Sequence, residues 1–151
     1  MICYRKATFG DVEQIFKLVN IYAAEGLMLA RSRNNLYETL RDMYVAEEDG
    51  KILGVGGLHI VWDEMAELRT LAVDKQALRH HIGGNIVKHL IEEGKTLGIK
   101  RVFTLTYQDK FFASLGFKLA NKDTMPQKVW KDCIDCPKFP NCDEIAMDIY
   151  I

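Results

Sequence analysis

Residues 71–87 read LAVDKQALRHHIGGNIV and contain the clearest change of pattern in the chain. The apolar triplet Leu71-Ala72-Val73 ends a predicted strand, and a loop leads from it to the glycine pair at 83–84. Apolar side chains at helical spacing predict a helix over 82–97, and the apolar run 101–107 predicts another strand. A strand, loop, helix and strand in this order form a right-handed crossover, so the two strands are expected to be parallel.

Short strands and helices are predicted on both sides of this crossover. They are a strand at 3–7, a helix from the Thr8-x-x-Asp11 pair to Gly26, a helix at 35–42, strands at 44–47, 52–62 and 65–73, a short helix at 109–115, a strand opening at 116–117 and a strand at 145–151. Three glycines in 52–62 indicate close packing or a bulge. The class is therefore mixed α+β with a mostly antiparallel sheet, and residues 1–151 are interpreted as one domain.

The composition is that of a soluble globular protein. Lys and Arg number 20 and Asp and Glu number 21, which gives a net charge of −1. This balance provides no electrostatic argument for nucleic acid or an anionic membrane as the partner. No apolar run reaches the length of a membrane span, and the N-terminus turns polar too soon for a signal peptide, so a cytoplasmic location is expected.

Three segments together resemble the Gcn5-related N-acetyltransferases. They are Leu71-Ala72-Val73, the helix start Gly83-x-x-Ile86-Val87, and Phe111–Phe117. The resemblance covers nearly the whole chain and implies a sheet flanked by about four helices, in which the strand ending at Val73 splays from its parallel neighbour. It further implies that pantetheine of acetyl-CoA lies in the gap and that the following loop wraps the pyrophosphate.

The physics of such a loop is general. Free main-chain N–H groups at a helix N-terminus bind an anion, and glycine lets the main chain approach it closely. The family pattern Arg-Gly-x-Gly-x-Gly falls on residues 78–83, where only Gly83 is kept. The coenzyme-binding residues implied by the resemblance are Leu71, Ala72, Val73, Arg79, His81, Ile82, Gly83, Gly84 and Asn85.

A narrower resemblance is to the short-form N-acetylglutamate synthases, which start arginine biosynthesis. It rests on segments 26–32, 57–59, 66–73, 101–106 and 111–117, which occur in matching order and spacing. It implies an acetyl-CoA-dependent N-acetyltransferase acting on the α-amine of a small acidic amino acid, glutamate first. Gln108 stands where some synthases have arginine, so glutamine and aspartate stay open. A homodimer is left open.

Glu67 is the candidate base for the acceptor ammonium. By strand alternation Glu67, Arg69 and Leu71 are expected on one face. The equal alternative to a base is an exposed strand glutamate or an ion pair between Glu67 and Arg69. Arg31 and Arg69 match substrate positions of the resembling group and would bind carboxylates, the alternative being solvated arginines. The resemblance implies that a main-chain N–H near a strand bulge, around 71–73, polarises the thioester carbonyl.

Other side chains leave alternatives open. Phe112 stands where many members have a tyrosine as general acid, so either the thiolate leaves without that acid or another group serves. Tyr107 is a weak substitute, and the favoured alternative for it is an ordinary aromatic residue at a strand end. His59 is interpreted as facing the cleft or packing beside glycines, and His89 as an ordinary helix residue. Cys133, Cys136 and Cys142 could hold zinc with Cys3, Asp143 or a histidine, but one ligand is missing, so no metal is favoured; redox sensing is the alternative.

Two rival functions remain at this level. The first is an acetyltransferase for another amine, such as a protein N-terminus or a polyamine, although two arginines near the substrate disfavour a polycation. The second is a catalytically weak regulatory module that binds acyl-CoA or a metal. The incomplete glycine loop and Phe112 favour this second alternative.

Overall fold

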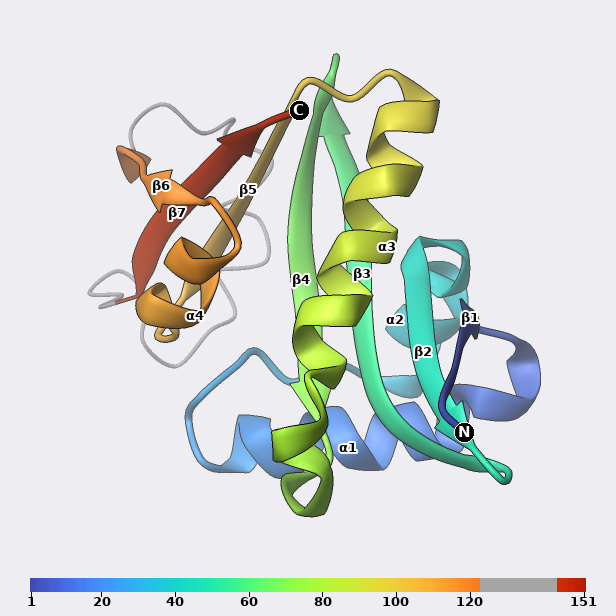
Figure 1. Cartoon of the computed structure of the whole chain (residues 1–151). Coiled ribbons are helices and arrows are strands. Elements are labelled where there is room, and N and C mark those ends of the chain that lie inside the picture. The colour runs from blue at the N-terminus through green and yellow to red at the C-terminus, as the bar shows by residue number, and fades with distance from the viewer. Residues whose placement is uncertain (123–143) are drawn as a thin grey trace.

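The computed structural model describes residues 1–122 and 144–151. Its seven-stranded sheet has the order β1-β2-β3-β4-β5-β7-β6, and every neighbouring pair is antiparallel except β4 and β5 (Figure 1). The elements in chain order are β1 (Cys3–Lys6), η1 (Phe9–Asp11), α1 (Val12–Ala24), α2 (Arg33–Glu38), η2 (Leu40–Asp42), β2 (Met43–Glu48), β3 (Lys51–Trp62), β4 (Met65–Val73), η3 (Lys75–His80), α3 (Ile82–Leu97), β5 (Arg101–Thr106), α4 (Asp109–Ser114), β6 (Lys118–Leu119) and β7 (Ile145–Tyr150).

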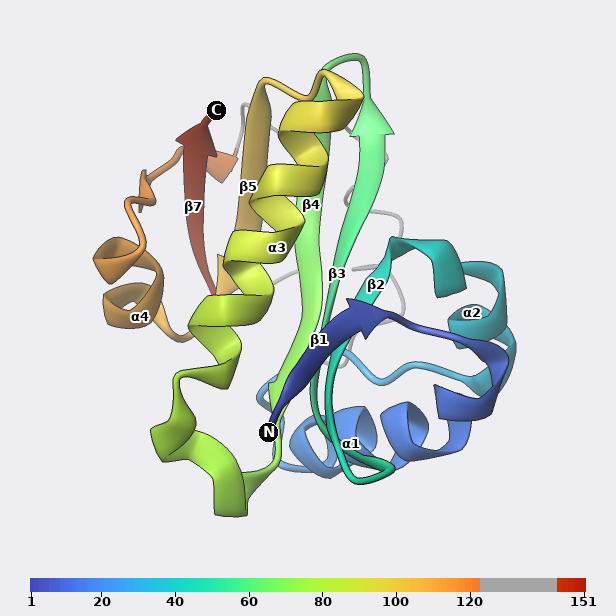
Figure 2. The same cartoon turned by 45° about the vertical axis from the view of Figure 1, so that its right-hand side comes forward.

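The helices cover both faces of the sheet. Figures 1 and 2 show α3 on one face and α1 and α2 on the other. The close approach of α3 depends on glycine, because a Cβ atom at Gly56 would lie only 2.7 Å from Cγ2 of Ile86 and one at Gly54 2.8 Å from Cγ2 of Ile82. The predicted close packing of this strand is thereby confirmed.

The second helix was predicted at 35–42, and this prediction was wrong at both ends. The helix begins earlier because the Ser32 side chain caps it by accepting a hydrogen bond from the Asn35 amide at 3.0 Å. It ends at Glu38, and a separate 3-10 turn, Leu40–Asp42, follows. That turn delivers Asp42 to the sheet directly before β2.

The parallel strands β4 and β5 pair over a short stretch only. Their ladder runs from Met65 opposite Arg101 to Glu67 opposite Phe103. Beyond it the strands part, as Figure 1 shows from their joined upper ends to their separated lower ends. The expected splay of this strand pair is confirmed, and β7 rather than β4 pairs with the rest of β5. Among the described residues, no helix is long and apolar enough to cross a bilayer.

Candidate functional site

A bulge interrupts β4 just beyond the parallel ladder. Ala72 pairs with Val55 and Arg69 with Gly57, so two residues of β4, Thr70 and Leu71, lie opposite a single residue of β3. Thr70 has a φ of 60°, a left-handed conformation that is rare for a β-branched residue. Such strain costs about 1–3 kcal/mol and gathers at functional sites. The bulge also takes main-chain groups out of the ladder.

The bulge reverses the side-chain alternation expected for β4. Leu71 packs with Leu68 in the cluster beneath α3, whereas Ala72 belongs to the cluster beneath α1. Glu67 and Arg69 alternate with Leu68 and therefore lie on the α1 face. The prediction that Leu71 shares a face with Glu67 and Arg69 was wrong, because the extra residue shifts every later side chain by one position.

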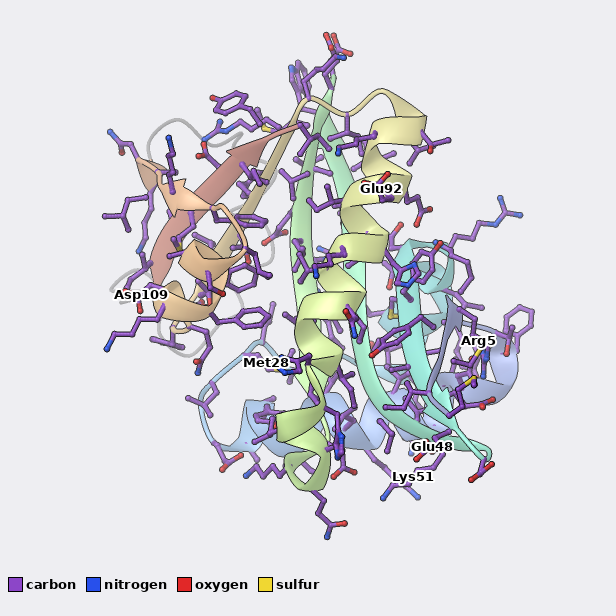
Figure 3. The ribbon with its side chains drawn as sticks, in the orientation of Figure 1. Arg5, Met28, Glu48, Lys51, Glu92 and Asp109 are labelled. Carbon is purple, nitrogen blue, oxygen red and sulfur yellow. The ribbon has the colours of Figure 1, made fainter. Side chains whose placement is uncertain are left out.

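A cleft of about 950 Å³ lies where β4 and β5 part. Its walls come from β4, the loop before α2, the start of α3, the end of β5 and α4. Figure 3 shows Met28 of that loop beside the gap, and Met28 lines the cleft. The predicted site residues among its lining are Arg31, Glu67, Arg69, Leu71, Ala72, Val73, His81, Ile82, Gly83, Gly84 and Asn85. The side chain of Arg79 lies outside what the structure describes.

The first turn of α3 lines the cleft. Its first intrahelical bond runs from the Asn85 amide to the His81 carbonyl at 3.1 Å, so the amides of 82–84 precede the helical ladder. His81 adopts the left-handed conformation, with φ 56°, that glycine would take without strain. Gly83 is tightly enclosed, because a Cβ atom there would lie 3.3 Å from Cζ of Phe111. This arrangement suits an anion.

Charged side chains form the part of the cleft on the α1 face. Arg69 lies 3.9 Å from Glu67, and their side chains are only 11% and 13% exposed. Arg31 is also buried, and the Asn20 side chain donates to its carbonyl at 3.1 Å. Two guanidinium groups and the Glu67 carboxylate are thus gathered on one face of the cleft, and guanidinium groups are well suited to carboxylate ligands.

A tyrosine in α1 makes a contact with the end of β4 that the sequence did not indicate. The hydroxyl of Tyr22, in α1, donates to the carbonyl of Val73 at 2.6 Å. Burial raises the pKa of this phenol, so it stays a donor at neutral pH. The helical position of Tyr22 was predicted, but a contact 51 residues along the chain has no local signal.

The other residues singled out in the sequence lie partly at the cleft and partly away from it. Tyr107 and Phe112 both line the cleft, and the Phe112 side chain is buried and packs against Phe111 and Phe117. The ring of His89 stacks against the rings of Tyr4 and Tyr44. Cys133, Cys136 and Cys142 lie outside the described residues. Within the part of the chain that is described, no group of three or more His, Cys, Asp or Glu side chains could hold a metal ion.

His59 lies beside the cleft and not in it. It is directly opposite Glu67 in the β3–β4 pairing, so the two side chains share the α1 face. Its Nδ1 atom lies 2.6 Å from Oδ2 of Asp42. The expectation of simple packing beside glycines therefore misses its partner, which depends on the turn before β2.

Comparison with known proteins gives a consistent picture. Residues 12–117 match the model of the Acetyltransferase (GNAT) family. The chain is 38% identical to an uncharacterized N-acetyltransferase of Chlorobaculum tepidum, over 96% of this chain and 94% of that protein. It is 40% identical to an amino-acid acetyltransferase of Mycobacterium tuberculosis, over 75% of this chain and 66% of that protein.

Solved structures agree with these relatives. N-acetylglutamate synthase of Neisseria gonorrhoeae, complexed with coenzyme A and N-acetyl-glutamate, superposes with a TM-score of 0.90 at 26% identity, over 99% of this chain and 35% of that one. A Mycobacterium tuberculosis protein in complex with CoA and a second ligand superposes with a TM-score of 0.83 at 30% identity, over 99% of both chains. This chain therefore spans about a third of the synthase.

Proposed function

Because the chain belongs to the acetyltransferase (GNAT) family, we propose that it transfers the acetyl group of acetyl-CoA to the α-amine of a small acidic amino acid, glutamate first. One observation carries this proposal. The same cleft is lined by the donors of the first turn of α3 and by Glu67, Arg69 and Arg31. It thus offers an anion site for a coenzyme and a cationic site with a carboxylate for an amino acid.

Acetyl-CoA would lie between β4 and β5. The amides of residues 82–84 would hold the pyrophosphate, and the side chains of His81 and Asn85 flank that position. Pantetheine would follow Leu71–Val73 toward the bulge. Relatives of known structure are complexed with coenzyme A, which supports a coenzyme site on this fold.

The acceptor would lie on the α1 face of β4. Arg31 and Arg69 would bind its carboxylates, and Glu67 would take a proton from its ammonium group. The free amine then attacks the thioester carbonyl, which a main-chain N–H near the bulge at Thr70 would polarise. A place in arginine biosynthesis follows if glutamate is the acceptor, as it is for the relatives named N-acetylglutamate synthase.

Mass spectrometry of the products tests the proposal directly. Acetyl-CoA is supplied with glutamate, glutamine, aspartate, ornithine or spermidine, and acetylated products are quantified. Acetylglutamate should form fastest, and Glu67→Gln and Arg69→Ala should each lower kcat/KM by about 10²-fold or more. The exposed residues Glu92 and Arg33 provide matched controls, since Glu92→Gln and Arg33→Ala change the same groups outside the cleft.

The outcomes separate the alternatives. Preferential acetylation of ornithine or spermidine would contradict the acidic acceptor and move the assignment to another amine. Acetyl-CoA binding without any acetylated product would contradict the enzyme assignment for this panel of acceptors. Equal activity of Glu67→Gln and Glu92→Gln would remove Glu67 from the mechanism while leaving the reaction in place.

A further inference from the structure

A second carboxylate and an imidazole lie next to the candidate base. Asp42, from the η2 turn, and His59, from β3, are joined at 2.6 Å, and His59 is the cross-strand partner of Glu67. Opposite side chains in an antiparallel pair have Cβ atoms about 5 Å apart. Asp42 lies over the neighbouring Gly57, where an added Cβ atom would lie 3.9 Å from Cβ of Asp42. The pair thus lies on the same face of the sheet as Glu67.

The contact with Asp42 determines which ring nitrogen of His59 can accept a proton. With Asp42 ionised, its carboxylate accepts the Nδ1–H of neutral His59, and Nε2 is left with its lone pair as a proton acceptor. The arrangement of carboxylate, imidazole and reacting group is the one by which proteins orient a histidine for proton transfer. If this contact served only to hold the η2 turn in place, it would use Nδ1 of His59 and give Nε2 no role.

Exposure decreases from this pair toward the cleft. The His59 side chain is 36% exposed and that of Glu67 only 13%. Neither Asp42 nor His59 is among the described residues that line the cleft, whereas Glu67 is. His59 is therefore the more solvent-exposed cross-strand neighbour of a largely shielded carboxylate. A base covered by acceptor and coenzyme must lose its proton once per turnover, and this is a route out.

We propose that the Asp42–His59 pair is a proton relay behind Glu67. The inference rests on the proposed function, because it needs Glu67 to act as the base. The acceptor ammonium gives one N–H proton to the Glu67 carboxylate, the resulting carboxylic acid gives its proton to Nε2 of His59, directly or through one water, and the imidazolium gives it to solvent. Asp42 stabilises the imidazolium while it exists.

The remaining bonds balance without a further reactant. The neutral amine forms the C–N bond and the C–S bond breaks, and the departing thiolate takes a second proton from the nitrogen of the tetrahedral intermediate. One proton is released to solvent for each amide formed. His59 never touches the acceptor in this scheme and acts through Glu67.

Asparagine at position 59 separates the relay from a structural role. Its amide nitrogen stands near the place of Nδ1 and can still donate to Asp42, but it has no group at Nε2. His59→Asn should therefore fold normally, lower kcat about 10-fold and leave the KM of both substrates within about twofold. His89→Asn, at a histidine stacked between tyrosines away from the cleft, is the matched control and should keep kcat.

Chemical rescue completes the experiment. Added imidazole should raise kcat of His59→Asn several-fold and leave the wild-type kcat unchanged, because a diffusing base replaces Nε2; a structural defect would show no rescue. Wild-type kcat in His59→Asn, or a loss of kcat that imidazole does not relieve, would overturn the relay while acetylglutamate formation upholds the function. No acetylated product from the wild-type protein with any acceptor would overturn both.

Discussion

The hydroxyl of Thr104 donates a hydrogen bond of 2.9 Å to the main-chain carbonyl of Leu68. This contact begins one residue beyond the last pair of the parallel ladder, Glu67 opposite Phe103. A side chain thus replaces the main-chain donor that a continued ladder would supply. Both partners are buried, so the contact satisfies a carbonyl that the parting of β4 and β5 would otherwise orphan.

Thr104→Val should destabilise the fold by about 1–3 kcal/mol. Valine keeps the shape of threonine, but it leaves the Leu68 carbonyl buried without a donor, and that desolvation is the cost. Urea unfolding followed by circular dichroism measures the change. Thr96→Val is the control, because that hydroxyl bonds a carbonyl on the exposed face of α3 and should change stability by less than about 0.5 kcal/mol. Equal effects would contradict a special role for Thr104.

Thr70→Gly should raise the free energy of unfolding by about 0–2 kcal/mol. Glycine adopts the left-handed conformation of Thr70 without the strain of a β-branched side chain, and that gain exceeds the entropic cost of glycine in the unfolded chain. Thr96→Gly, in regular helix, carries the same entropic cost without the relief and should lose about 1 kcal/mol. Thermal melting compares the two, and similar losses would show that Thr70 is unstrained in solution.

The sequence predicted the strand that ends at Val73, its parallel neighbour and the crossover helix. Apolar periodicity determines these elements, and it is a property of neighbouring residues. The cleft between the two strands was expected only from the family resemblance. The resemblance implied a bulge around 71–73, and the structure has it at Thr70 and Leu71. The left-handed conformation of Thr70 was not predicted, because threonine normally favours regular strands and the surrounding sheet imposes this conformation. The contacts of Tyr22 with Val73 and of Asp42 with His59 were also missed, since each depends on tertiary packing.

Gly56→Ala tests the close approach of α3 to the sheet. The added methyl group would lie 2.7 Å from Cγ2 of Ile86 and 3.1 Å from Cδ1 of Leu71, so α3 must shift outward. Overpacking of this kind costs about 1–3 kcal/mol. Gly10→Ala is the matched control, since nothing lies within 4 Å of its Cβ position, and it should be near neutral. Chemical denaturation measures the free energy of unfolding of both variants. Equal stability of Gly56→Ala and Gly10→Ala would contradict the tight contact between α3 and β3.

Asp11 makes stability depend on pH in the acid range. Hydrogen bonds from Arg5, at 2.7 and 2.9 Å, are the main cause that holds the pKa of this carboxyl below its ordinary 3.8, and burial opposes them. Because the folded pKa is the lower one, the stabilisation is complete above about pH 4 and is lost as pH falls from there through the folded pKa. Asp11→Asn should therefore be less stable than wild type at pH 7, and the difference should shrink below pH 4.

Urea unfolding from pH 7 to pH 2 measures this convergence. Glu13→Gln is the control, because Glu13 and Arg33 form an exposed pair, and such pairs contribute little to stability. The Asp11→Asn difference should also persist in 0.5 M NaCl more than that of Glu13→Gln, since screening acts less on partly buried pairs. A stability difference for Asp11→Asn that stays constant down to pH 2 would show that the Asp11 carboxylate does not carry the contact with Arg5.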